Sequence, residues 1–153
     1  MTLSIVPDDL SGKEVQELLA EHLADMHATS PPESVHALDL DGLRDPAVTF
    51  YSAWLGDVLM GCGALKDLGD GHAEIKSMRT SSHARGRGVG GQLLAFLLAE
   101  AHDRALTRVS LETGVEPYFA AARRMYARHG FTECPPFGSY RPDPNSVFMT
   151  RTL

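Results

Sequence analysis

Four glycines and two arginines occupy seven consecutive positions of this chain, in the segment Arg85-Gly86-Arg87-Gly88-Val89-Gly90-Gly91. An apolar run follows at once, and its spacing predicts a helix over about residues 89–104. Glycines let a ligand approach the backbone closely, and the first turn of a helix leaves N–H groups unpaired and partly positive. These features predict a site for a phosphate or pyrophosphate group.

The elements around this loop can be predicted from periodicity and turn residues. The expected order is a strand over 3–6, a helix from Ser11 to about 27, a short helical turn at 40–43, strands over 48–55, 58–65 and 72–80, the helix over 89–104, a strand over 108–112, a helix over 117–129, and strands from 131 and over 146–152. Ser11 and Glu14 match a capping box at the start of the first helix. The order β-α-(α)-β-β-β-α-β-α-β-β predicts an α/β (α+β) fold, a mixed sheet flanked by helices.

Bulk composition limits the function classes. With 153 residues, we expect one domain over 1–153. A formal charge of −6 argues against broad nucleic-acid binding, and no stretch is long and apolar enough for a membrane span. Two cysteines are too few for a disulfide framework, which favours a cytoplasmic setting. The seven histidines are scattered without ligand spacing, so no metal site is expected.

Two motifs identify a family resemblance. Arg85-x-x-Gly88-x-Gly90 resembles the Q/R-x-x-G-x-G/A signature of the GCN5-related N-acetyltransferases (GNAT family), and Tyr126-Ala-Arg-His-Gly-Phe resembles that family's Y-x-x-x-G-F. A Rossmann fingerprint needs different glycine spacing after a parallel strand, and a P-loop needs a Gly-Lys-Ser/Thr triplet that is absent. The resemblance covers nearly the whole chain, is close to a group of small bacterial acetyltransferases, and implies a mostly antiparallel sheet.

The resemblance implies acetyl-CoA as cosubstrate. Its pyrophosphate would be held by backbone N–H groups of Arg85, Gly86, Arg87, Gly88, Val89, Gly90 and Gly91. Backbone groups of Met78, Arg79 and Thr80 would pair with the pantetheine arm, between strands that splay apart to admit it. The alternative is a glycine-rich turn with solvent-exposed arginines.

The resemblance also suggests catalytic residues. Tyr126 matches a tyrosine that protonates the departing thiolate, although a packed core tyrosine is the alternative. Glu74 is the first candidate for a general base, placed by strand alternation on one face with Lys76 and Met78. A plain Glu–Lys pair is equally compatible with the sequence, Glu112 is the second candidate, and solvent could also take the proton.

The predicted function is acetyl transfer to a primary amine of a small molecule or peptide, by direct attack in a ternary complex. The alternatives are a non-catalytic acyl-CoA-binding or regulatory module and a nucleotide-binding switch. Neither nucleic acid nor membrane is expected as a partner. A homodimer is one assembly that the resemblance allows, because members of the family are often dimers. Residues 33–46 are expected as an exposed connector more than as a cleft wall. Tyr118, Phe137 and Tyr140 could line the acceptor pocket or stack on the C-terminal loop.

Overall fold

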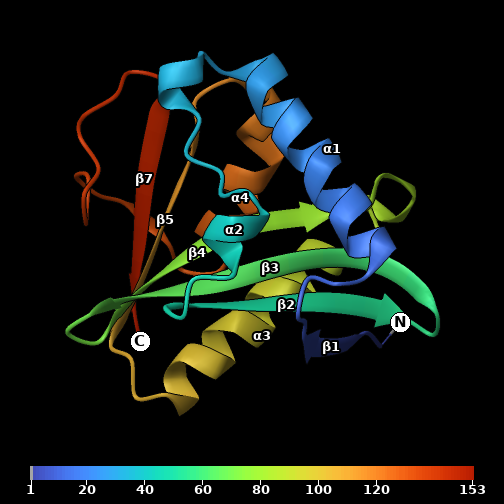
Figure 1. Ribbon diagram of the computed structural model, residues 1–153. Coiled ribbons are helices and arrows are strands. Elements are labelled where there is room, and N and C mark those ends of the chain that lie inside the picture. The colour runs from blue at the N-terminus through green and yellow to red at the C-terminus, as the bar shows by residue number, and fades with distance from the viewer. Residues whose placement is uncertain (1) are drawn as a thin grey trace.

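The computed structural model describes residues 2–153 and has a mixed α/β fold (Figure 1). The strands are β1 (Ser4–Pro7), β2 (Val48–Leu55), β3 (Val58–Gly69), β4 (His72–Thr80), β5 (Arg108–Gly114), β6 (Thr132–Glu133) and β7 (Ser146–Thr152). The helices are α1 (Lys13–Thr29), α2 (Leu40–Leu43), α3 (Val89–Asp103) and α4 (Ala120–Arg128), with short 3-10 turns η1 (Pro32–Ser34), η2 (Ser82–Ala84) and η3 (Pro117–Phe119).

Within the described residues the strands form one sheet in the order β1-β2-β3-β4-β5-β7-β6. Only β4 and β5 pair in parallel, and the other neighbours are antiparallel. The predicted fold class, a mixed and mostly antiparallel sheet flanked by helices, is therefore confirmed. None of the helices in this part of the chain combines the length and apolar character needed to cross a bilayer.

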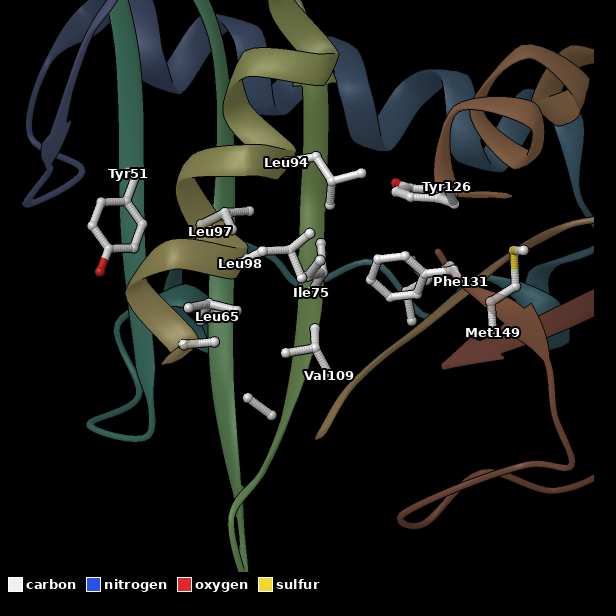
Figure 2. Close-up of a cluster of buried hydrophobic side chains, with 13 residues drawn as sticks. Tyr51, Leu65, Ile75, Leu94, Leu97, Leu98, Val109, Tyr126, Phe131 and Met149 are labelled. Carbon is white, nitrogen blue, oxygen red and sulfur yellow. The ribbon is translucent and has the colours of Figure 1, made fainter. Parts of the chain in front are cut away.

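Two apolar clusters hold helices on opposite faces of the sheet. Val15, Leu18 and Leu19 of α1 pack with Cys62 and Ala64 of β3 on one face. On the other face, leucines of α3 pack with strand residues and with Tyr126 and Phe131, as Figure 2 shows. Burial of these side chains supplies the main favourable free energy of folding. The sheet thus separates an α1 and α2 side from an α3 and α4 side (Figure 1).

The predicted bounds of 48–55, 72–80 and 146–152 agree with β2, β4 and β7. The capping box was wrong: α1 begins at Lys13 with Gly12 as N-cap, and no side chain caps it. The Ser11 hydroxyl instead donates to Asp9 Oδ1 at 2.6 Å, because this nearer carboxylate competes for it. Pro117 starts the 3-10 turn η3, and α4 follows it.

A bulge in β4 changes which residues share a face. Ser77 has a φ of 54°, and the register with β3 shifts between Ala64↔Lys76 and Cys62↔Arg79. Glu74 and Lys76 face the α1 side, whereas Met78 packs with Leu97 of α3 on the other side. The predicted face shared by Glu74, Lys76 and Met78 was therefore wrong at Met78, because the bulge adds a residue that alternation cannot reveal.

The parallel pair β4 and β5 opens toward its carboxyl ends. The last paired residues are Ile75 and Leu111, and the strands continue beyond them without pairing each other. Figure 1 shows β5 and β7 diverging from β4. The predicted splay is present, and it leaves residues 76–80 of β4 free on their β5 side.

Candidate functional site

A cavity of about 680 Å³ lies at the opening between β4 and β5. It is lined by parts of α1, β4, β5, the glycine-rich loop, α4, residues 34–37 and Tyr140. One continuous space therefore runs from the glycine loop, through the gap between the strands, to the α1 side of the sheet. We call residues 85–91 the cradle, and the part lined by Glu74, Lys76, Arg79, Glu112, Tyr140 and residues 34–37 the acceptor end.

The cradle has the geometry of an anion site. Gly86 and Gly88 have φ values of 74° and 81°, a left-handed conformation that favours glycine, and a Cβ added at either would meet no atom within 4 Å. Gly88 is the N-cap of α3, and no side chain caps this helix start. The N–H groups of the first turn are thus available to a ligand beside open space, which fits the pyrophosphate of acetyl-CoA.

The predicted cradle residues differ in where they lie. Arg85, Gly86, Gly88, Val89, Gly90 and Gly91 line the cavity, whereas Arg87 is exposed and does not. The cradle adjoins the end of β4, because a Cβ at Gly90 would lie 3.8 Å from Thr80 Oγ1. Met78, Arg79 and Thr80 line the cavity next to it. The structure therefore brings together every predicted cofactor-binding residue except Arg87.

The Arg79 side chain turns to α1, away from the cradle. Its Nη2 lies 2.6 Å from Glu21 Oε1 and 2.5 Å from Asp25 Oδ2, and its Nη1 donates to the Tyr118 hydroxyl at 3.0 Å. The Arg79 side chain is only 5% exposed. These hydrogen bonds hold the pKa of the Asp25 carboxyl below its usual value. Arg79 thus fixes α1 and η3 against the wall of the cavity.

Tyr126 lies on α4 at the α3 side of the cavity, packed near Phe131 (Figure 2). Its residue is 6% exposed, and burial raises the pKa of its hydroxyl to about 12. No side chain or backbone group among residues 2–153 forms a hydrogen bond with that hydroxyl. Tyr126 is therefore a protonated phenol at neutral pH, with its donor available to a ligand.

Glu74 takes part in a buried polar group on the other side of the sheet. Its Oε2 accepts a hydrogen bond from the Tyr140 hydroxyl at 2.5 Å and lies 3.3 Å from Lys76 Nζ. Lys76 also donates to the Tyr140 hydroxyl at 3.0 Å. The Lys76 and Glu74 side chains are 8% and 5% exposed. The Glu–Lys pair that the sequence allowed is present, and burial and the Glu74 charge raise the pKa of Tyr140.

Glu112 is the first residue of β5 beyond the paired segment, and it lines the cavity. Burial raises the pKa of its carboxyl to about 7, and the Ser146 hydroxyl and the Lys76 charge offset this only in part. Within residues 2–153 no ion pair engages Glu112. The acceptor end therefore holds one carboxylate with an ion-pair partner, Glu74, and one without an ion pair of its own, Glu112.

Sequence patterns missed several wall residues. His22 and Met26 of α1 and residues 34–37 line the cavity. Part of the segment expected as a connector is thus cavity wall, held there by the edge contact of His36 on Tyr140 and by a hydrogen bond from Asn145 to Ser34. Burial lowers the pKa of His22 to about 4, which keeps its ring neutral. The helical spacing of α1 indicates that His22 is buried, but no local sequence pattern indicates that residues 34–37 line the cavity.

Across residues 2–153 no group of three or more His, Cys, Asp or Glu side chains is arranged to hold a metal ion.

Phe137 packs on Tyr140 and Phe148, so it supports the wall that Tyr140 forms. Arg123 donates to the Gly114 carbonyl at 2.6 Å and steadies the turn before α4. These residues are structural supports for the cavity.

Comparisons with known proteins agree with this geometry. The profile of the "Acetyltransferase (GNAT) family" matches residues 14–131. The chain is 53% identical over 146 residues to the "Uncharacterized N-acetyltransferase YsnE" of Bacillus subtilis (strain 168), covering 95% of this chain and 97% of that protein. It is 50% identical over 150 residues to the "Uncharacterized N-acetyltransferase YedL" of Escherichia coli (strain K12), covering 98% and 94%.

Solved structures show the same fold. A Klebsiella pneumoniae protein classed as an acyl-CoA N-acyltransferase superposes with a TM-score of 0.83 at 30% identity, covering 99% of this chain and 98% of the other. A Bacillus subtilis acetyltransferase in complex with CoA superposes with a TM-score of 0.75 at 18% identity, covering 99% of both chains. The chain therefore belongs to the acetyltransferase (GNAT) family, and the prediction of an enzyme of the N-acetyltransferase class is confirmed.

Proposed function

We propose that this enzyme transfers the acetyl group of acetyl-CoA directly to a primary amine of a small molecule or peptide while both substrates are bound. The observation that carries the proposal is the single cavity that joins the cradle to the buried carboxylates through the gap between β4 and β5. A thioester arm in the gap would meet an amine from the α1 side without either substrate leaving the site. Such a site reduces the entropic cost of bringing the two together.

The cradle and the end of β4 would hold the donor. Backbone N–H groups at the start of α3 suit the pyrophosphate, and the unpaired β5 side of residues 76–80 suits the amide groups of the pantetheine arm. A backbone N–H near Met78 would stabilise the oxyanion that forms when the amine attacks. These roles need backbone groups, which is consistent with the Arg79 side chain pointing elsewhere.

For the base, the contacts favour Glu112 over Glu74. The Oε2 of Glu74 already accepts from Tyr140 and faces Lys76, both of which stabilise its charge and weaken it as a base. Glu112 forms no ion pair within residues 2–153, the Ser146 hydroxyl and the Lys76 charge offset its burial only in part, and its pKa of about 7 suits proton transfer at neutral pH. Glu112 would accept one proton from the acceptor ammonium, and the neutral amine would then attack the thioester carbon.

Tyr126 would protonate the departing sulfur as the carbon–sulfur bond breaks. The second ammonium proton leaves as the amide forms and restores the phenol through solvent. Burial raises the pKa of Tyr126, but the same burial raises the pKa of a thiol beside it, so the two remain close enough for transfer. A cytoplasmic setting and a homodimer stay predictions alongside this mechanism.

The test is release of CoA thiol from acetyl-CoA across a panel of polyamines, amino acids, aminoglycosides and peptide N-termini, with mass spectrometry of the products. We expect at least one acetylated amine, and Tyr126→Phe should lower kcat about 100-fold with acetyl-CoA affinity unchanged. Tyr51→Phe is the matched control, because Tyr51 lies outside the cavity and bonds Arg104. A silent panel alongside tight CoA binding would instead support the non-catalytic acyl-CoA-binding module.

A further inference from the structure

The charged side chains at the acceptor end differ in whether they have a partner of opposite charge. Lys76 Nζ lies 3.3 Å from Glu74, and Arg79 Nη2 lies 2.6 and 2.5 Å from Glu21 and Asp25. Each cation that lines this end thus already faces at least one carboxylate. A ligand carboxylate would have to displace a protein carboxylate from a buried ion pair, which is costly.

The other basic groups along the cavity do not change this balance. Arg85 belongs to the cradle and its charge acts on Asp25. Arg128 is the last residue of α4, and the next residue, His129, adjoins the cradle, because a Cβ at Gly91 would be 3.8 Å from His129 Cε1. His22 is neutral because of its burial. The His36 ring lies against Tyr140, and Asp143 is close enough for their charges to interact. A free cation for an anionic ligand is therefore absent from the acceptor end within residues 2–153.

Glu112 is the carboxylate without an ion-pair partner within residues 2–153, and the Ser146 hydroxyl and the Lys76 charge offset its burial only in part. Among the described residues no cation pairs with it, and it faces the cavity directly beyond the last β4–β5 pair. An ammonium group entering from the α1 side would supply the missing positive charge. A carboxylate on the same ligand, one carbon away from that amine, would be brought close to Glu112 without a cation to bind it.

We infer that the acceptor is a cationic primary amine with no carboxylate beside its amino group, and that Glu112 selects for this class over α-amino acids. The inference rests on the proposed function, because it concerns the second substrate of the same reaction. It separates decarboxylated amines, polyamines and carboxyl-blocked amino acids from free amino acids. Glu112 acts here by charge, through contact with the ammonium group.

The experiment compares matched pairs that differ only in the carboxylate: agmatine with arginine, tyramine with tyrosine, histamine with histidine, and phenylalanine amide with phenylalanine. We expect kcat/KM for the amine or amide to exceed that of its amino acid at least about 30-fold in the pairs that react, since a like charge without a partner lies near Glu112. Glu112→Gln should lower kcat/KM for the amines and reduce the ratio about tenfold, because both series lose the attraction of Glu112 for the ammonium group and only the amino acids also lose the repulsion of their carboxylate.

Glu133→Gln is the control, since Glu133 is an exposed carboxylate on β6 outside the cavity, and it should leave the ratio unchanged. CoA binding by each variant is measured by calorimetry to show that it is folded. Equal or better turnover of the amino acids, or a ratio that Glu112→Gln does not alter, would overturn the inference and leave acetyl transfer intact. No turnover of either series would overturn the proposed function and the inference together.

Discussion

The cradle takes its positions from seven consecutive residues, whereas the acceptor end draws on α1, β4, β5, residues 34–37 and the loop that carries Tyr140. The cradle works through backbone N–H groups and two left-handed glycines. The acceptor end works through side chains such as Tyr140 and Glu74, which lie 66 residues apart in sequence and 2.5 Å apart in space. Donor binding is therefore a local property of the chain, and acceptor recognition is a property of the tertiary structure.

The largest expected effect comes from filling the cradle. Gly88→Glu should abolish CoA binding, because the side chain would occupy the open space beside the helix start and repel the pyrophosphate. Calorimetry with CoA measures the loss, which we expect to exceed about 100-fold, the loss of more than about 2.7 kcal/mol of binding free energy.

Gly69→Glu is the matched control for this variant. Gly69 has a φ of 86° with no atom within 4 Å of an added Cβ, and it is the last residue of β3, just before the turn to β4 and outside the cavity. It should carry a similar conformational cost, about 1 kcal/mol, without any loss of CoA affinity. Full CoA binding by Gly88→Glu would contradict the assignment of residues 85–91 as the pyrophosphate site. Donor binding would then no longer be a local property of the chain.

The same contrast explains what the sequence could predict. The strand bounds of β2, β4 and β7 and the glycine-rich loop at the start of α3 could be predicted, because residue period and glycine spacing are contiguous signals, and the splay followed from the family resemblance. The capping box failed because Asp9, two residues before Ser11, takes its hydroxyl. The shared face of Glu74 and Met78 failed because the bulge at Ser77 is visible only in the register with β3.

The wall of the acceptor end had no such signal. His36 contacts Tyr140 and Asn145 contacts Ser34, pairs that are distant in sequence and irregular in structure. The roles of Glu74 and Glu112 likewise depend on partners from elsewhere in the fold. The family resemblance and the strand positions named both carboxylates as candidates, but only contacts separate Glu74, which has an ion-pair partner, from Glu112, which has none within residues 2–153.

The second prediction sharpens that separation through stability. The folded-state pKa of Glu112 is about 7, above its usual 4.5, so between these values the folded state holds a proton that the unfolded state has lost. The contribution of the Glu112 proton to the stability of the fold is fully present below about pH 4.5, and it is lost as pH rises through about 7. Glu112→Gln should remove this loss, so the free energy of unfolding of the variant relative to the wild type should rise by on the order of 3 kcal/mol between pH 4.5 and 8.

Urea unfolding of both proteins across this pH range measures the difference, and Glu133→Gln should show no such pH-dependent gain. A constant difference between Glu112→Gln and the wild type would mean that Glu112 is compensated in the folded state. Glu74 and Glu112 would then both be stabilised as carboxylates in the folded state, and the difference between them would disappear.

The third prediction addresses the bulge that shapes the acceptor side of β4. Ser77 has a φ of 54°, and its buried hydroxyl has no hydrogen-bond partner in the described residues. Ser77→Gly relieves both costs and adds some entropy to the unfolded state, so we expect a net gain of about 0.5–1 kcal/mol. Ser52→Gly is the opposite control, because the Ser52 hydroxyl donates to Asp8 at 2.6 Å and its loss should destabilise the fold.

Urea unfolding decides between these outcomes. A loss of stability in Ser77→Gly would show that the serine side chain stabilises the bulge. In that case part of the acceptor end would also be encoded locally.

The smallest expected effect concerns the two arginines of the cradle. Arg87 is exposed and lies outside the cavity, whereas Arg85 lines it. Arg87→Ala should weaken CoA binding only about two- to threefold, and the difference should vanish at high salt, since a solvated charge acts through screened electrostatics. Arg85→Ala should weaken binding more, about five- to tenfold, and keep part of that effect at high salt. Calorimetry at low and high salt tests both variants. A larger loss from Arg87→Ala than from Arg85→Ala would mean that long-range charge contributes more to CoA binding than contact at the cavity wall, and donor binding would then depend less on the local geometry of the cradle.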